Sequence, residues 1–222
     1  MPQTSTIRCN LCGAETTRPF CEGIDRLHGF EGRFCYETCC HCGLVYMNPQ
    51  IRFEDLPGYY PDDYAPHAAA TADKSEKPPK LHLPESCLAA LGPKSRVLDV
   101  GCGSGAFLAA VRSRVGCRVQ GLDLSDNAVR AARDKYGIEV FGGTIFDAPF
   151  EPETFDMVTA WSYIEHVNDP AAVLAAMHNL LKPGGVLILK TPNATGWNAR
   201  LFRGKWYHLD CPRHLFLFDP DT

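Results

Sequence analysis

Apolar residues in the second half of the chain fall into short β-branched runs, separated by longer stretches with helical spacing. The clearest run, at residues 97–100, is apolar except for Asp99 and is typical of a buried strand in a parallel sheet. A predicted helix has Ser125 as its N-cap and ends at Gly137. In chain order the pattern predicts strand 96–100, helix 106–115, strand 118–122, helix 126–136, strands 138–141 and 154–160, helix 171–181, a turn at 182–185 and strand 186–190. This alternation predicts an α/β fold with a doubly wound, Rossmann-like, mostly parallel sheet that binds ligands at the carboxyl ends of its strands.

Three glycines follow the first strand of this sheet directly. Gly101, Gly103 and Gly105 precede the first helix, so a strand, a glycine turn and a helix N-terminus form a cradle that a ligand can approach closely. Asp123 ends the next apolar run about twenty residues later, where a carboxylate can accept both hydroxyls of a ribose. The pattern therefore predicts a site for a nucleoside-containing ligand.

The pattern is weaker in the first 94 residues. Residues 44–47 predict a strand that ends at Asn48, and residues 81–91 predict a short helix. Residues 67–80 are rich in Ala, Lys and Pro without apolar periodicity, as in a linker or a mobile loop. We predict a small N-terminal module at 1–50, a linker and approach segment at 51–94 and the α/β domain at 95–222.

Composition narrows the class of protein. The 222 residues are 45% hydrophobic and 22% charged, as in a globular protein, and no apolar run reaches the roughly 20 residues of a membrane helix. The formal net charge of −4 argues against nucleic acid as a partner. Eleven cysteines without an N-terminal secretory pattern favour metal ligation in a reducing compartment, so we expect a cytoplasmic protein.

Two C-x-x-C-G knuckles predict a metal site in the N-terminal module. Cys9 and Cys12 form the first pair and Cys39 and Cys42 the second, and residues 13–38 between them must contain a long hairpin. Four thiolates around one ion are typical of a structural, zinc-ribbon-like zinc site without an open position, which contributes to folding rather than to catalysis. Spare donors that could replace a predicted ligand are Cys21, Cys35, Cys40 and His41.

The glycine turn matches two families of nucleotide-binding proteins. Residues 101–106 fit the G-x-G-x-x-A form of the dinucleotide fingerprint. Residues 98–105 more closely resemble the first motif of class I S-adenosylmethionine-dependent methyltransferases, which has an acid where Asp99 stands. A carboxylate attracts the positively charged ammonium group and sulfonium of that donor, whereas it would repel the pyrophosphate of a dinucleotide. Residues 155–158, 165–169 and 181–187 are similar to later motifs of the family, and the knuckles to a bacterial subgroup with a zinc-binding segment.

The resemblance implies a donor site. The three glycines would approach the methionine part of the donor, with Asp99 nearby, and Asp123 would hold the ribose. The residues implied beside the adenine are Leu124, Thr144 and Ile145. Thr144 stands where the family usually has an acid, and Asp147 is an alternative for reading the adenine amino group. Ala160 and Trp161 would pass beside the sulfonium.

The resemblance leads to two further expectations, one for the approach segment and one for the C-terminus. Tyr59, Tyr60 and Tyr64 either close over the donor or pack the two domains together. The family's sheet normally finishes with a helix and a two-strand hairpin after residue 222, so we expect a truncated or compact variant. Its fifth strand would then present an open edge through which a homo-oligomer can form.

Two groups of residues are candidates for catalysis. His166 follows the fourth strand on the face where substrate arrives, and a histidine suits a general base near neutral pH. His208, Arg213 and His214 lie in an aromatic, basic stretch, where either histidine is an alternative base and Arg213 can pair with an anionic group of a substrate. Alternatively, this stretch packs on the sheet and caps loops.

The sequence therefore predicts a methyltransferase that uses S-adenosylmethionine and a structural zinc ion. We expect a small-molecule acceptor methylated at oxygen: a glycan precursor, a phenol- or quinone-like compound or a secondary metabolite. One alternative is an RNA methyltransferase whose zinc module binds nucleic acid. Another is a non-catalytic protein that binds the donor and uses the zinc module as an interaction surface.

Overall fold

The computed structural model describes residues 3–61, 81 and 83–222 and divides into two units. Unit 1 consists of Met1–Pro61, Ser162–Ala172 and Lys190–Thr222, and unit 2 of Asp62–Trp161 and Val173–Leu189. The predicted linker at 67–80 and Tyr64 lie outside the described residues. None of the described helices is long and apolar enough to cross a membrane.

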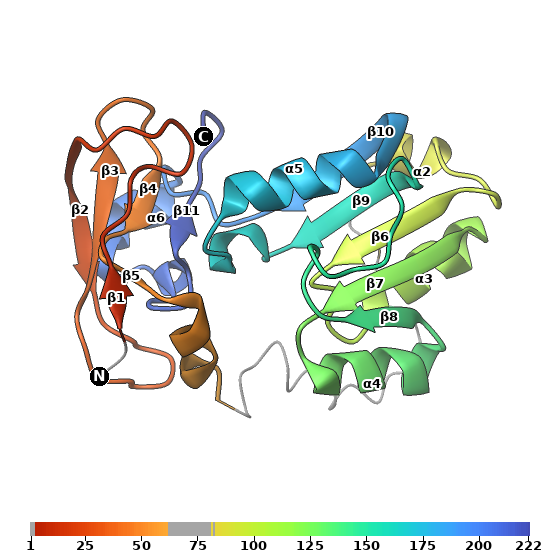
Figure 1. Ribbon diagram of the computed structural model, residues 1–222, viewed down its shortest axis with the longest axis horizontal. Coiled ribbons are helices and arrows are strands. Elements are labelled where there is room, and N and C mark those ends of the chain that lie inside the picture. Colours follow the sequence, from red (N-terminus) through yellow and green to blue (C-terminus); the bar gives the residue numbers. More distant parts are fainter. Residues whose placement is uncertain (1–2, 62–80, 82) are drawn as a thin grey trace. The chain divides into compact units, whose positions relative to one another are not determined.

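Unit 2 contains the predicted α/β sheet (Figure 1). Its strand order is β10-β9-β6-β7-β8, and the pairs β6–β7, β6–β9 and β7–β8 are parallel. The strands are β6 Arg96–Val100, β7 Arg118–Asp123, β8 Glu139–Gly142, β9 Phe155–Trp161 and β10 Leu181–Lys190. The doubly wound, mostly parallel sheet predicted from the pattern is confirmed.

The helices between these strands, α3 Ala106–Val115, α4 Asp126–Tyr136 and α5 Pro170–Leu180, follow the predicted ranges closely. Before β6 lies α2 Glu85–Ala89, which is shorter than the helix predicted at 81–91. The Ser125 hydroxyl accepts a hydrogen bond from the amide of Ala128, and Gly137 ends α4 at a φ of 57°. Both caps act as their residue types predict, since Ser satisfies an orphan amide and Gly tolerates the left-handed conformation.

The predicted turn at 182–185 is wrong in one respect, because β10 begins at Leu181 directly after α5 and includes these residues. Lys182 explains the difference: its ammonium group lies 2.8 Å from the carboxylate of Asp156 on β9 and holds the chain beside that strand. Gly184 keeps a turn-like φ of 79°, which glycine adopts without strain.

Unit 1 contains a four-stranded antiparallel sheet of order β11-β4-β3-β2. Its strands are β2 Thr17–Gly23, β3 Phe34–Cys39, β4 Val45–Met47 and β11 Phe216–Leu217, and a separate pair joins β1 Thr4–Ser5 to β5 Gln50–Ile51. β2 and β3 form the long hairpin predicted between the two knuckles. Short helices complete the unit: η1 Phe53–Tyr59, η2 Ile164–His166, α6 Trp197–Phe202, η3 Arg203–Lys205 and η4 Tyr207–Leu209.

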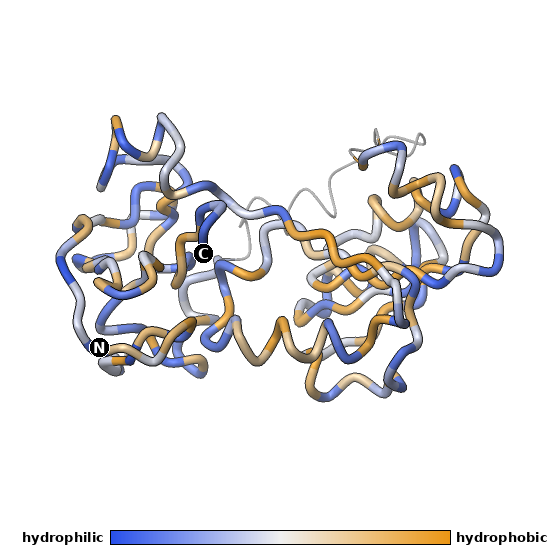
Figure 2. Tube along the Cα trace, turned by 90° about the horizontal axis from the view of Figure 1, so that it is seen from above, coloured by the Kyte–Doolittle hydropathy of each residue, from blue (hydrophilic) through white to orange (hydrophobic). Residues whose placement is uncertain are grey.

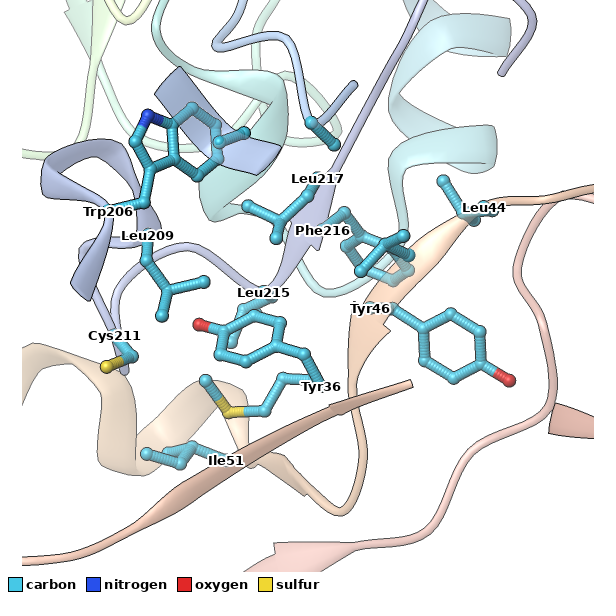
Figure 3. Close-up of a cluster of buried hydrophobic side chains, with 14 of the residues drawn as sticks. Tyr36, Leu44, Tyr46, Ile51, Trp206, Leu209, Cys211, Leu215, Phe216 and Leu217 are labelled. Carbon is cyan, nitrogen blue, oxygen red and sulfur yellow. The ribbon is translucent and has the colours of Figure 1, made fainter. Parts of the chain in front are cut away.

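The division into units differs from the predicted boundaries at the C-terminal end. The prediction assigns residues 95–222 to one domain, whereas β11 pairs with β4, so that Phe216 lies opposite Tyr46. Figure 3 shows side chains of β3 and β4 and of the C-terminal segment gathered in one buried cluster. Burial of this apolar surface draws the last segment to the N-terminal module. Linker composition, on which the predicted boundaries depend, carries no signal for such a long-range pairing.

Unit 2 has a core of its own. Val97, Leu108, Val111 and Met157 are fully buried between the sheet and its helices. Figure 2 shows the hydrophobic residues of the chain concentrated along its strands and helix faces, with hydrophilic residues at many of the connections. The carboxyl ends of β6, β7 and β8 are thereby fixed by packing behind them, and they carry the predicted donor-binding residues.

Candidate functional site

The glycine turn between β6 and α3 has left-handed backbone at three positions. Gly101, Gly103 and Gly105 have φ values of 74°, 51° and 72°, which residues with a side chain rarely adopt. A Cβ at Gly105 would lie 2.9 Å from the Cβ of Ala132, so this glycine allows α3 and α4 to pack. A Cβ at Gly103 would meet no atom of the described chain within 4 Å. The turn is therefore open to a ligand at Gly103.

Asp123 is held against this turn from the end of β7. One carboxylate oxygen accepts a hydrogen bond of 2.8 Å from the amide of Gly103, and the other accepts one of 2.9 Å from the amide of Ser125. A carboxylate oxygen has two lone pairs, so each oxygen keeps one acceptor site. The half-buried side chain is thus oriented by the protein and can still accept two hydroxyl groups.

Asp99 is an interior group beneath the turn. It is buried, and the Thr159 hydroxyl donates a hydrogen bond of 2.6 Å to its carboxyl group. Burial raises the pKa of Asp99 to about 8; the Thr159 hydrogen bond opposes the shift and the charge of Asp123 adds to it. Asp99 therefore tends to take up a proton near neutral pH, unless a positive charge nearby stabilises its ionised form.

The residues after β8 form a small hydrogen-bonded group. The Thr144 hydroxyl donates to the carboxylate of Asp147, so the two alternatives for reading an adenine amino group lie together. Ile145 is buried, whereas Leu124 after β7 is 58% exposed and offers an apolar surface. The structure thus places all four of these residues at the carboxyl edge of β7 and β8.

The end of β9 contributes Ala160 and Trp161. Ala160 is buried, and the indole ring of Trp161 packs on Phe107 of α3 with a centroid separation of 5.0 Å. The indole nitrogen of Trp161 is buried and has no hydrogen-bond partner among the described residues. A buried polar group without a partner is uncommon, so this donor marks the carboxyl end of β9 as a candidate part of the site.

The four predicted cysteines meet in unit 1. The sulfur atoms of Cys9 and Cys42 are 3.4 Å apart and those of Cys12 and Cys39 are 3.5 Å apart. Four sulfurs bound to one zinc ion at about 2.3 Å would be about 3.8 Å apart, so the cluster fits such an ion. The spare donors Cys21, Cys35, Cys40 and His41 are not members of this group.

The knuckle turns also favour thiolate at one of these cysteines. Burial raises the pKa of Cys9 to about 12. Burial opposes ionisation of Cys39 too, but hydrogen bonds from the amides of Cys42 and His41 outweigh it and lower the pKa of Cys39 to about 6. A thiolate is the form that binds metal, so Cys39 is prepared for ligation.

His166 and His214 face each other in unit 1, with ring centroids 4.5 Å apart and planes at 82°. The carbonyl of Arg213 lies 3.1 Å from Nδ1 of His166, and the carbonyl of His208 lies 2.9 Å from Nδ1 of His214. A carbonyl can only accept, so Nδ1 of His214 carries a hydrogen and its Nε2 keeps a lone pair. Nδ1 of His166 also lies 2.9 Å from the hydroxyl of Tyr60, which can donate or accept, so the tautomer of His166 depends on which of the two partners it bonds. Burial lowers the pKa of His166 to about 3, with His214 adding to the shift, and lowers that of His214 to about 4.

Glu165 lies beside these imidazoles and is not among the site residues predicted from the sequence. It is fully buried, and neither carboxylate oxygen has a well-aligned hydrogen bond within the described chain. Burial raises the pKa of Glu165 to about 7, while the nearby hydroxyls of Thr191 and Ser162 offset part of the rise. Ligand atoms of Glu165, His166 and His214 lie within 4.8 Å of one another, so these side chains form a second group able to hold a metal ion. Its position next to His166 is the sequence signal for Glu165.

Arg213 lies inside unit 1 and not at its surface. Its guanidinium is fully buried, donates to both oxygens of Asp25 at 2.8 and 2.9 Å and donates to Asp210 at 2.8 Å. A further hydrogen bond of 3.1 Å runs to the carbonyl of Tyr59. The sequence predicts that Arg213 pairs with an anionic group of a substrate, whereas in the structure carboxylates of the protein itself already engage the guanidinium.

The remaining predicted residues have separate surroundings. His208 is exposed and lines a cavity of about 460 Å³ with Trp197, Trp206 and Asn193. Its backbone carbonyl accepts the hydrogen bond from Nδ1 of His214. Tyr59 is buried against Phe30 and does not lie free to stack on a ligand. The hydroxyl of Tyr60 lies 2.9 Å from Nδ1 of His166, which brings the approach segment to the histidine pair.

Comparison with protein families matches residues 70–222 to the methyltransferase domain. This match covers more than half of the chain. The chain belongs to the methyltransferase family. The predicted class I S-adenosylmethionine-dependent fold is confirmed by this match together with the parallel sheet.

Curated relatives of this methyltransferase include two ubiquinone biosynthesis O-methyltransferases. The protein of Xanthomonas campestris is 40% identical over 109 residues, which are 46% of this chain and 45% of that protein. The protein of Ralstonia nicotianae is 41% identical over 103 residues, or 43% of this chain and 42% of the relative. The matched part thus spans less than half the length of these relatives.

Solved structures similar to the methyltransferase overlap with about half of it. A putative methyltransferase in complex with the Trm112 activator of Haloferax volcanii is 31% identical, with a TM-score of 0.43 over 46% of this chain and 48% of that one. A methyltransferase of Thermotoga maritima, a possible histamine N-methyltransferase, is 24% identical, with a TM-score of 0.46 over 61% and 63% of the two chains.

Two chemically different groups of residues thus stand out in this methyltransferase. In unit 2, glycine backbone and an oriented carboxylate suit a nucleoside. In unit 1, a buried carboxylate and two imidazoles of lowered pKa lie together and offer acceptor atoms, which suit a proton, a hydroxyl group or a cation.

Proposed function

We propose that the protein transfers a methyl group from S-adenosylmethionine to a hydroxyl group of a small molecule. The observation that carries the donor half is the Asp123 carboxylate, which is held by the Gly103 amide and keeps two acceptor sites for a ribose. The methionine part would then lie along the turn of Gly101, Gly103 and Gly105. Adenine would lie beside Leu124, with Thr144 and Ile145 at its edge.

The donor's positive charge would complete this site. Asp99 is buried with a raised pKa, and a sulfonium and an ammonium group nearby would favour its ionised form. Ala160 and Trp161 follow on the next strand, where the methyl group would pass to the acceptor. An in-line displacement then needs alignment of the two reactants more than any other assistance.

The acceptor half of the proposal depends on the group around His166. A hydroxyl nucleophile must lose a proton during transfer, and a base is most effective when its pKa lies near the working pH. The pKa of His166 is lowered to about 3 and that of Glu165 is raised to about 7. The sequence predicts His166 as the base, and we add Glu165. In this proposal Glu165 accepts the proton, and neutral His166 beside it accepts a hydrogen bond that orients the acceptor. His214 would support His166, and His208 belongs to the neighbouring cavity.

Oxygen is proposed as the methylated atom because the curated relatives are O-methyltransferases. Glycan precursors, phenol- or quinone-like compounds and secondary metabolites all offer such a hydroxyl. The net charge of −4 weighs against the alternative of an RNA substrate. A non-catalytic donor-binding protein would have no use for a buried carboxylate that lacks a well-aligned hydrogen bond, because such a group costs stability.

We further propose that Cys9, Cys12, Cys39 and Cys42 hold a structural zinc ion. Four sulfur ligands leave no open position, so the ion would stabilise unit 1 and take no part in methyl transfer. Eleven cysteines support a reducing compartment such as the cytoplasm. β10 ends the strand order of its sheet, so its edge is where a second copy would pair.

The test of this function is a turnover assay with the purified full chain. Methyl-labelled S-adenosylmethionine is incubated with a panel of phenols, catechols, sugar nucleotides and small RNAs, and products are identified by mass spectrometry. The proposal expects donor binding by calorimetry and label on the oxygen of at least one small molecule. Label on RNA alone, or donor binding without turnover of any acceptor class, would contradict it.

A further inference from the structure

The segment 165–172, which follows β9 and includes the first residues of α5, is held in unit 1 by side chains far away in sequence. It carries Glu165 and His166, so its importance for catalysis rests on the proposed function. The carbonyl of Glu165 accepts a hydrogen bond of 2.7 Å from the amide of Leu215. The side chain of Asn168 donates to Gln50 at 3.2 Å and to the carbonyl of Ile51 at 3.1 Å.

The closest link to the metal module is made by Asn10. Its side-chain amide donates a hydrogen bond of 2.9 Å to the carboxylate of Asp169. Its side-chain oxygen accepts a hydrogen bond of 2.9 Å from the backbone amide of Ala171. Asn10 thus donates one hydrogen bond to the segment and accepts another from it, at positions two residues apart. The pair of bonds fixes both the orientation of the segment and its distance from Asn10.

These bonds meet at the N-terminus of α5, where the first amides have no partner within the helix. The carboxylate of Asp169 caps the amide of Ala172 at 3.0 Å, as an N-cap residue does. Asn10 supplies a second cap to the same turn from 161 residues away in sequence. The start of α5 is therefore defined by the knuckle as well as by its own N-cap.

The position of Asn10 is in turn set by the first knuckle. It lies between Cys9 and Cys12, in a turn closed by a hydrogen bond of 2.8 Å from the amide of Gly13 to the carbonyl of Cys9. The amide of Cys9 also donates to the carbonyl of Ala14 at 3.0 Å. A cysteine pair bound to an ion would hold this turn rigidly, and Asn10 with it.

We propose that Asn10 is a positioning residue for methyl transfer: from the first cysteine knuckle it fixes the segment that carries Glu165 and His166. The metal module then acts on the reaction without touching donor or acceptor. Loss of the two Asn10 hydrogen bonds frees the start of α5, and a small displacement of a proton acceptor is enough to slow a reaction that depends on alignment.

The test compares Asn10→Ala with Arg8→Ala in the full chain. Arg8 directly precedes the same knuckle but pairs with Glu15 at the surface, and neither side chain belongs to the segment. Asn10→Ala should lower kcat by about tenfold or more, with donor affinity unchanged because the donor residues belong to unit 2. Its pH–rate profile should shift, since the surroundings of Glu165 change. Arg8→Ala should behave as the unaltered protein does.

A second pair of variants keeps the proposal testable if Asn10→Ala folds poorly. Asn10→Asp places a second carboxylate against that of Asp169, so the two repel each other, and kcat should fall below that of Asn10→Ala. Combining it with Asp169→Asn reverses the polarity of the pair, so that an amide at 169 donates to a carboxylate at 10, and should restore most of the rate. Failure of this rescue would overturn the proposal.

Amide hydrogen exchange separates this proposal from the proposed function. In Asn10→Ala, residues 166–172 should exchange faster than in the unaltered protein, whether or not an acceptor has been found. Unchanged exchange there, or a kcat within twofold of the unaltered protein, would overturn the role of Asn10. Faster exchange in a protein that methylates nothing would contradict the proposed function and leave the contact itself established.

Discussion

The guanidinium of Arg213 and the carboxylate of Asp25 form a fully buried ion pair across 188 residues of sequence, with donor–acceptor distances of 2.8 and 2.9 Å. Asp25 belongs to the connection between β2 and β3, and Arg213 precedes β11. The carbonyl of Arg213 also lies 3.1 Å from Nδ1 of His166. This one pair thus links the metal module, the C-terminal segment and the histidine group.

Asp25→Asn should destabilise the protein by about 3–5 kcal/mol, because it leaves the buried guanidinium partly uncompensated. Urea denaturation measures the loss. The matched control is Glu22→Gln, which breaks the exposed pair with Arg33 and should cost less than about 1 kcal/mol. Burial opposes ionisation of Asp25, but the hydrogen bonds from Arg213 lower its pKa. The stabilisation is therefore fully present above the ordinary pKa of an aspartate and is lost as the pH falls from that value through the lowered pKa of the folded protein.

Asp123→Ala should raise the Kd for S-adenosylmethionine at least tenfold, or about 1.4 kcal/mol. The substitution removes both ribose acceptors and releases the Gly103 amide. Isothermal titration calorimetry measures the affinity, and Asp134→Ala on the exposed face of α4 serves as the charge control. Equal donor affinity in the two variants would remove Asp123 from the donor site.

Glu165→Gln should reduce kcat about a hundredfold or more, the usual contribution of a positioned base. Only the ionised form accepts a proton, and the pKa of Glu165 is raised to about 7. The rate should therefore rise with pH up to about 7 and then level off. In Glu165→Gln this dependence should disappear. A profile that keeps its rise near pH 7 in the variant would assign the titrating group elsewhere.

Metal analysis of the purified protein should find about one zinc ion per chain. Cys12→Ser should abolish this zinc and lower the stability of unit 1, because metal binding contributes to folding. Cys35→Ser changes an exposed thiol of β3 outside the cluster and should retain the ion. Equal zinc content in both variants would mean that another donor replaces Cys12.

Local signals predict unit 2 well. The caps of α4 at Ser125 and Gly137 depend on residues within one helix, and the β-branched run of β6 depends on burial of adjacent positions. The glycine turn and Asp123 are predictable for the same reason, since backbone conformation and strand ends are determined by neighbouring residues. The two knuckles likewise identify the four cysteines that meet in unit 1.

Long-range partners in unit 1 cannot be predicted from one sequence. No local pattern indicates that Arg213 pairs with Asp25 or that Phe216 lies opposite Tyr46, because these contacts arise from packing between distant segments. The same reason explains why the sequence does not identify Glu165 as a site residue. Its importance follows from complete burial without a well-aligned hydrogen bond and from the histidines packed beside it, which only the folded chain creates.

The pairing of β11 with β4 has a consequence for synthesis of the protein. A ribosome releases the N-terminal module first, yet the fourth strand of its sheet ends at Leu217. During translation the edge of β4 therefore stays unpaired while more than 160 further residues are added. A nascent chain with such an open edge is a natural client for chaperones.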